Sequence, residues 1–229
     1  QDPMVLLEGD SIVEAHRDFV RAGARVLVTT SYQVSFTGFA AAGFDAATTE
    51  ATLRRSVDLA REAFAAEGVD GWVAASIGPY AAHLADGSEY RADHGRTVAQ
   101  LRDWHRRRLD VLCAAGPDVL AIETIAGATE AEALLEEVAG RGIPAWLSMT
   151  CAGDRLRSGE DPVPVWRAAR DVPEVIAVLS NYPIAETTVR IAEANVQKLK
   201  NTRQRMLTDP AGMQIQMDEG AIQTSIEKN

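Results

Sequence analysis

Apolar, β-branched stretches alternate along this chain with segments of helical period, and this alternation restricts the possible folds more than any other feature. The stretches that predict strands are Arg25–Thr30, Trp72–Ile77, Asp118–Glu123, Pro144–Met149 and Val175–Ser180. Strands that are apolar throughout and are each followed by a helix are typical of parallel sheets. The chain is therefore predicted to be an α/β protein, with either an open doubly wound sheet or a closed (β/α)8 TIM-type barrel.

Helices are predicted between these strands from capping signals and apolar periodicity. Ser11 and Glu14 have the capping-box spacing at the start of a helix, and Thr129 and Glu132 have it ahead of another. Further helices are predicted over 49–66, 97–115 and 163–171. No strand is followed by a glycine-rich phosphate-binding turn, and this favours the barrel over the open sheet.

Composition and charge exclude several classes of protein. A chain of 229 residues with 46% hydrophobic residues can bury the core of one or two domains. Its formal charge of -10 would repel a phosphate backbone, so nucleic acid is not expected as a partner. The basic run Arg106-Arg107-Arg108 is interpreted as an exposed helix face. Because no apolar run reaches the roughly 20 residues of a membrane span and no secretory signal is visible, we expect a soluble, cytoplasmic protein without membrane partners.

Polar residues follow the predicted strands, where a parallel barrel builds its active site. Glu123 ends an apolar strand, so its carboxylate is expected in the barrel mouth, holding a cationic amine or acting as a base. The alternative for Glu123 is a helix N-cap or an ion pair. Tyr32 follows the first predicted strand and is either a site residue or a packed aromatic at the rim. The segment Asp86–Tyr90 follows the second and is either part of the site or an ordinary polar turn.

Several linked motifs carry a resemblance to a known family. They are Thr30-Ser31-Tyr32-Gln33, Ser76-Ile77-Gly78-Pro79-Tyr80, Leu84-Ala85-Asp86-Gly87-Ser88-Glu89-Tyr90 and Leu120-Ala121-Ile122-Glu123-Thr124-Ile125. In this order and spacing they resemble the homocysteine S-methyltransferase family, in particular its S-methylmethionine-using type, over roughly residues 6–195.

The resemblance implies a function and a set of site residues. Members are (β/α)8 barrels that bind zinc through cysteine thiolates and transfer a methyl group from S-methylmethionine or S-adenosylmethionine to homocysteine, giving methionine. Zinc holds the homocysteine sulfur as the nucleophilic thiolate. By resemblance, Glu123 binds the amino group of homocysteine, Tyr32 lies at the pocket rim, and Asp86 and Ser88 belong to a loop near that pocket. The implied partners are small molecules, homocysteine and a methyl-sulfonium donor.

The sequence also departs from the family pattern. Tyr182 occupies a position where the family has a zinc cysteine, and the two cysteines of the chain, Cys113 and Cys151, match no ligand position, so zinc ligands are not predicted here. Because the first and last barrel strands are not visible, residues 1–195 are predicted to be a partial barrel and residues 196–229 a helical or irregular tail. One alternative is a non-catalytic binding or scaffold protein on a degenerate barrel, in which the tail covers the strand edges or mediates a homo-oligomer. Another is a metal-free lyase with Glu123 as base.

Overall fold

Five parallel strands form one sheet in the computed structural model, which describes residues 9–92 and 94–180. The strands are β1 (Val26–Val28), β2 (Trp72–Ile77), β3 (Val119–Ile125), β4 (Ala145–Met149) and β7 (Val175–Ser180). They lie in the order β1-β2-β3-β4-β7, and every neighbouring pair is parallel. The predicted α/β class and all of the predicted strands are thus confirmed, and the carboxyl ends of the strands lie at one edge of the sheet.

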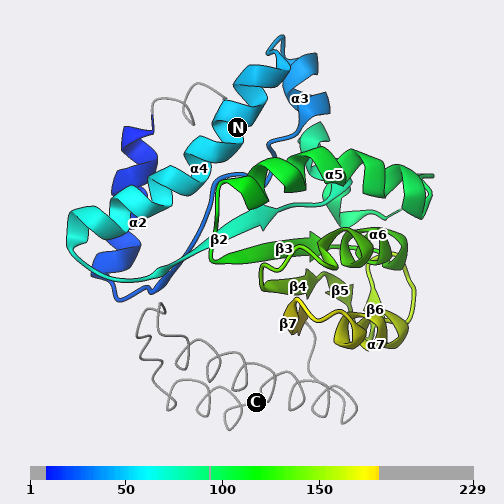
Figure 1. Ribbon diagram of the computed structural model, residues 1–229. Helices are drawn as coiled ribbons and strands as arrows, with labels where there is room; N and C mark the ends of the chain where they lie inside the picture. The colour runs from blue at the N-terminus through cyan, green and yellow to red at the C-terminus, as the bar shows by residue number, and fades with distance from the viewer. Residues whose placement is uncertain (1–8, 93, 181–229) are drawn as a thin grey trace, which may run out of the picture.

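One helix precedes the first strand, and the others connect successive strands. They are α2 (Asp10–Arg21), α3 (Phe36–Ala41), α4 (Ala46–Glu67), α5 (Val98–Ala114), α6 (Ala128–Val138) and α7 (Val163–Asp171). Short elements follow the strands at the carboxyl edge: the 3-10 turns η1 (Tyr80–Leu84) and η2 (Ser88–Tyr90), and a small hairpin of β5 (Cys151–Ala152) and β6 (Arg155–Leu156). In Figure 1, α5 and α6 lie together over one face of the sheet. No helix in the described ranges is long and apolar enough to cross a membrane.

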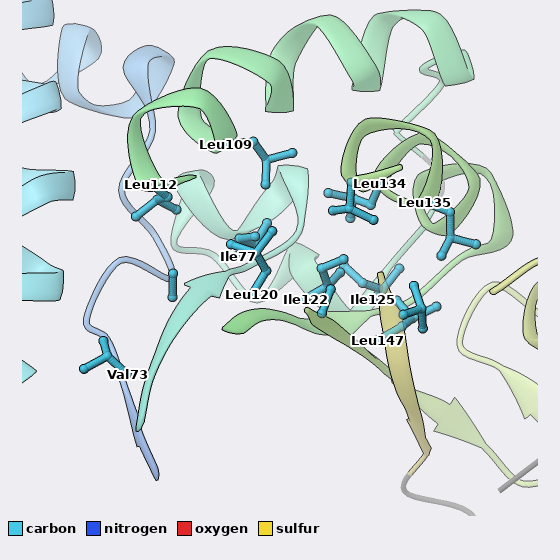
Figure 2. Packing of buried hydrophobic residues seen from close by; sticks show 14 of the residues in the cluster. Val73, Ile77, Leu109, Leu112, Leu120, Ile122, Ile125, Leu134, Leu135 and Leu147 are labelled. Carbon is cyan, nitrogen blue, oxygen red and sulfur yellow. The ribbon is translucent and has the colours of Figure 1, made fainter. Parts of the chain in front are cut away.

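The face of the sheet beneath the helices forms the main hydrophobic core. Alternate strand residues point into it, because successive side chains of a strand point to opposite faces. Figure 2 shows this packing, with leucines of α5 and α6 over the strands. The labelled residues are Val73, Ile77, Leu120, Ile122, Ile125 and Leu147 of the strands, and Leu109, Leu112, Leu134 and Leu135 of the helices. This packing fixes the strands relative to one another.

The opposite face carries smaller and more polar residues. Ala74, Val119 and Ala121 form a separate small cluster there, against Trp146 and Ile176. Ser76 and Glu123 continue this face toward the carboxyl edge of β2 and β3, and a hydrogen bond between their side chains joins them. The same alternation that builds the core therefore directs a carboxylate away from it.

Helix starts differ from the sequence prediction in two places. The N-cap of α2 is Gly9 rather than Ser11, and that of α6 is Gly127 rather than Thr129, with no side-chain cap at either. The carboxylate of Glu160 instead accepts a hydrogen bond from the Ala128 amide at 2.8 Å. A tertiary contact thus replaces the local cap, which sequence spacing does not reveal.

Two fold predictions remain: that the sheet belongs to a barrel, and that residues 196–229 form a helical or irregular tail. Among the described residues, β1 and β7 are the two outer strands of the sheet and do not pair with each other. The predicted boundary at residue 195, the tail over 196–229 and Tyr182 all lie outside the described residues.

Candidate functional site

A chain of hydroxyl groups joins the carboxyl ends of β1, β2 and β3. The side chains of Thr29 and Ser31 lie 2.7 Å apart, and Ser31 Oγ donates to the Ser76 carbonyl at 2.7 Å. The Ser76 amide donates to Thr29 Oγ1 at 3.0 Å, and Ser76 Oγ donates to Glu123 Oε1. All three hydroxyl residues are buried. Because buried hydroxyls that are fully bonded are rigid, this network fixes one oxygen of Glu123.

Glu123 is the half-buried acid of this network. Burial raises the pKa of its carboxyl, while the hydrogen bond from Ser76 acts in the opposite direction. Within the described part of the chain, Oε2 of Glu123 has no hydrogen-bond partner, and Glu123 forms no ion pair. A desolvated carboxylate with one free oxygen is suited to binding a cation. The expected N-cap and ion-pair alternatives for Glu123 are not what the described residues form.

A β-bulge lies at Glu123 and Thr124. Ile122 pairs with Leu147, but the next pairing of β3 is Ile125 with Met149, so β3 holds one more residue than β4 over this interval. Thr124 has φ of 65°, in the left-handed region that a β-branched residue rarely adopts. Backbone strain of this kind costs on the order of 1–3 kcal/mol and is concentrated at functional sites.

Tyr32 lies next to this bulge. A hydrogen bond joins its side chain to that of Thr124, and burial raises the Tyr32 pKa to about 12, so the phenol is neutral at physiological pH. Gly78, after β2, packs directly on Tyr32: a Cβ built on Gly78 would lie 2.6 Å from the Tyr32 carbonyl oxygen. The structure therefore brings Tyr32 and the Glu123–Thr124 segment together, with a side-chain-free residue behind the tyrosine.

Asp86 and Ser88 occupy a turn of their own. Asp86 is exposed, and its Oδ1 accepts a hydrogen bond from the Ser88 amide at 2.9 Å. Hydrogen bonds from Ser88 hold the pKa of the Asp86 carboxyl below its usual value. The carboxylate of Glu89, in the same loop, also contributes to the raised pKa of Tyr32. Asp86 and Ser88 thus shape the loop.

A buried polar network behind the loop after β2 was not found from the sequence. Arg108 is only 1% exposed and donates through Nη2 to the Gly78 carbonyl at 2.6 Å and to His105 Nδ1 at 3.1 Å. His105 Nε2 lies 2.9 Å from Glu130 Oε1, which also accepts from the Tyr80 amide. Burial lowers the His105 pKa to about 4, so the imidazole is neutral and relays between the guanidinium and the carboxylate.

The interpretation of Arg106-Arg107-Arg108 as an exposed face is therefore wrong for Arg108. Arg106 and Arg107 do form exposed ion pairs, with Asp103 and Glu50 respectively. Arg108 lies one position before Leu109 and three after His105, both fully buried. The helical spacing of Arg108 relative to His105 and Leu109 could have indicated from the sequence that its side chain is buried.

In the part of the chain that the structure describes, neither cysteine belongs to a candidate metal site. Cys113 lies on α5 beside Arg141, and Cys151 Sγ lies 3.2 Å from Ser180 Oγ. The described ranges contain no group of three or more His, Cys, Asp or Glu side chains able to hold a metal ion. Since the whole sequence has two cysteines, a site made of three thiolates does not fit the residues of this chain.

Comparisons with known proteins identify the family that this chain resembles. The family model for homocysteine S-methyltransferase matches residues 2–224. Homocysteine S-methyltransferase 4 of Zea mays is 43% identical over 73% of this chain and 54% of the relative, and homocysteine S-methyltransferase of Escherichia coli is 42% identical over 78% and 57%. The chain thus spans about half the length of these curated relatives.

Solved structures give the same result. The metallated form of the homocysteine methyltransferase MmuM from Escherichia coli superposes with a TM-score of 0.73 at 39% identity, covering 86% of this chain and 70% of that one. The oxidized form of MmuM gives a TM-score of 0.74 over the same shares. None of these relatives supports the scaffold alternative. The chain belongs to the homocysteine S-methyltransferase family.

Proposed function

We propose that this chain takes part in methyl transfer from a methyl-sulfonium donor, S-methylmethionine or S-adenosylmethionine, to homocysteine, giving methionine. In the reaction the homocysteine sulfur forms a bond to the methyl carbon as the carbon–sulfonium bond breaks. The electron pair of that bond stays on the departing thioether, and the thiol proton is released. The observation that carries the proposal is the Glu123 carboxylate, held by Ser76 through one oxygen and free at the other.

Glu123 is the residue that binds the homocysteine ammonium group. Burial raises the pKa of its carboxyl, which means that the ionised form lacks compensation in the free protein. An ammonium group at Oε2 supplies that compensation through a charge-assisted hydrogen bond. Because Ser76 fixes the orientation of the carboxylate, little side-chain freedom is lost when the amino acid binds.

Tyr32 forms the rim beside the bound amino acid. Its neutral phenol presents an aromatic face and a hydroxyl without adding charge near the sulfonium donor. Asp86 and Ser88 keep the following loop in shape. Their contribution to substrate binding is therefore indirect.

The metal requirement is separate from this binding role. MmuM has been solved in a metallated form, and the family resemblance implies zinc held by cysteine thiolates. The two cysteines of this chain do not supply that ligand set, so no step of the reaction is assigned to a metal here. Glu123, Ser76 and Tyr32 act on the amino-acid part of the substrate and not on its sulfur.

The five strand–helix units belong to an eight-stranded (β/α)8 barrel. The uninterrupted parallel strand order and the superposition on MmuM support this architecture. In a barrel, the carboxyl ends of β1 to β3 form part of the active-site face, which is where the hydroxyl network lies.

Homocysteine binding tests the proposal directly. Calorimetric titration of the full chain with homocysteine is compared for wild type, Glu123→Ala and Glu123→Gln, with Glu132→Gln on the exposed side of α6 as the control for loss of one charge. We expect both position-123 variants to bind at least about 30-fold more weakly, because the ammonium loses a desolvated charge partner. Unchanged affinity in Glu123→Ala would contradict the assignment.

Turnover is measured in parallel. The full chain is incubated with homocysteine and each donor, with and without added zinc, and methionine is followed. Methionine formation that is lost in Glu123→Gln and kept in Glu132→Gln supports the proposed activity. Homocysteine binding without methionine formation under any condition would limit the chain to substrate binding.

A further inference from the structure

A hollow lies at the amino-terminal ends of α5 and α6. It has a volume of about 520 Å³ and is lined by parts of the 91–96 loop, the first turn of α6 and the 157–160 turn after β6. None of Thr29, Ser31, Ser76 and Glu123 lines it, so it is separate from the network of the candidate site. Its size is within the range of small-molecule binding sites.

Three guanidinium groups from two different loops line this hollow. Among the described residues, Arg91, Arg96 and Arg157 form no ion pair with a carboxylate, although the chain as a whole is acidic. Arg96 Nη2 donates to the Tyr80 hydroxyl at 3.1 Å, and the Arg157 guanidinium lies 5.7 Å from the centre of the Tyr90 ring. Most of the N–H donors of the three arginines remain available, and His94 adds an imidazole to the same wall.

The two carboxylates of the hollow are already engaged by protein groups. Glu130 Oε1 accepts from His105 and from the Tyr80 amide. Glu160 Oε2 accepts from the Ala128 amide at 2.8 Å and from Ser158 Oγ at 2.6 Å. These acids therefore tie α5, α6 and the hairpin together, and the lining holds three guanidinium groups against two carboxylates.

The backbone that carries Arg157 is held in place. The Arg157 amide donates to the Thr150 carbonyl at 3.0 Å, and the Ser158 amide donates to the Ala126 carbonyl at 3.0 Å. On the other side, the Arg91 amide donates to the Ser88 carbonyl at 2.8 Å. Because these bonds fix the backbone at Arg91, Arg157 and Ser158, a ligand would order mainly side chains at these positions, and less binding free energy would be lost to ordering.

We propose that this hollow binds a small, multiply charged anion that carries phosphate or carboxylate groups. Guanidinium groups match both kinds of oxygen pair through bidentate hydrogen bonds, and several of them around one cavity select more than one negative charge. The net charge of the chain argues against a nucleic acid backbone as the occupant, because repulsion from the rest of the surface grows with the length of the polyanion.

Calorimetric titration of the full chain tests the site with two probes, pyrophosphate and tricarballylate, in a low-salt buffer free of other polyvalent anions. Arg96→Gln and Arg157→Gln each remove one charge from the hollow, on different loops. Arg54→Gln is the matched control, because Arg54 is exposed on α4 and does not line the hollow. Circular dichroism checks that each variant is folded.

We expect saturable binding with a stoichiometry of one in wild type and Arg54→Gln, and about tenfold or greater weakening in both hollow variants. Binding of pyrophosphate alone identifies a phosphate ligand, and binding of tricarballylate alone identifies a polycarboxylate. Absence of saturable binding of both probes, or equal weakening in the Arg54→Gln control, would overturn the proposal. Homocysteine affinity is not part of this readout, so the two proposals fail independently.

Discussion

The two faces of the sheet differ in what their side chains do, although the same strands form both. On the helix-covered face, Ile77, Leu120 and Ile122 are fully buried among leucines of α5 and α6. On the other face, Ser76 and Glu123, each the sequence neighbour of one of these residues, join in a hydrogen bond. One strand thus supplies stability and chemistry in alternate positions, and changes at adjacent residues are expected to have separable effects.

The largest effect is expected for Ile122→Ala, on the helix-covered face. Removing this fully buried side chain leaves a cavity and should lower the free energy of unfolding by about 2–5 kcal/mol. Chemical denaturation measures the loss. Homocysteine affinity of the folded fraction should stay near the wild-type value, and a large loss of affinity at retained fold would show that the two faces are not separable.

The next effect belongs to the buried network on the helix side. Burial lowers the His105 pKa to about 4, below its unfolded value, so the neutral imidazole contributes stability that is complete above about pH 6.5 and is lost as pH falls toward about 4. The total is on the order of 3 kcal/mol. Denaturation across this pH range should show a shallower loss for His105→Gln than for wild type. His83→Gln, a half-buried histidine of η1, is the control, and identical slopes in all three proteins would refute the prediction.

Gly78 follows β2 and contacts Tyr32 of the candidate site as well as Arg108 of the buried network. Gly71 precedes the same strand and serves as its counterpart. A Cβ at Gly78 would press on the Tyr32 backbone and ring, whereas one at Gly71 would press on the Phe64 ring. Both alanine variants should lose roughly 1–3 kcal/mol of stability through overpacking. Only Gly78→Ala should also weaken homocysteine binding, because it displaces Tyr32. Calorimetric titration with homocysteine measures the affinity of both variants. Equal affinities of Gly78→Ala and Gly71→Ala would show that Tyr32 is not part of the binding site.

The smallest effect is a gain in stability at the candidate site. Because the Glu123 pKa is raised by burial, its neutral form favours the folded state at low pH, and this contribution is lost as pH rises through the folded pKa. Glu123→Gln keeps a group of the same shape without the charge. Its melting temperature should exceed that of wild type at neutral pH, by an amount equivalent to less than about 1 kcal/mol, and the difference should shrink on acidification. A lower melting temperature at neutral pH would contradict the desolvated state of Glu123.

The strands and their order of appearance could be predicted from the sequence, because apolar β-branched runs of this length are typical of buried parallel strands. Glu123 and Tyr32 could also be placed at strand ends by position alone. The residues that contact the site segments could not be predicted from the sequence. Ser76 depends on the register between β2 and β3, and Arg108 depends on which face of α5 is buried.

Other features have no local signal at all. Thr124 in the left-handed region contradicts the preference of a β-branched residue, and only the pairing of β3 with β4 imposes it. Neither predicted capping box is used, and at the start of α6 a tertiary contact from Glu160 takes its place. At Thr124, local propensity is overridden beside the candidate site, as is common where function competes with foldability.

The extra residue in β3 has a consequence for engineering. With strict alternation, Ile125 would share a side of the sheet with Glu123; the bulge returns it to the leucine-rich interior instead. The strand thereby places two positions at a reactive edge and still re-enters the hydrophobic layer. Deleting Thr124 would leave simple alternation, which still directs Ile125 to the interior and Glu123 to the opposite face, so loop redesign in this family can remove the bulge without exchanging the sides of these residues.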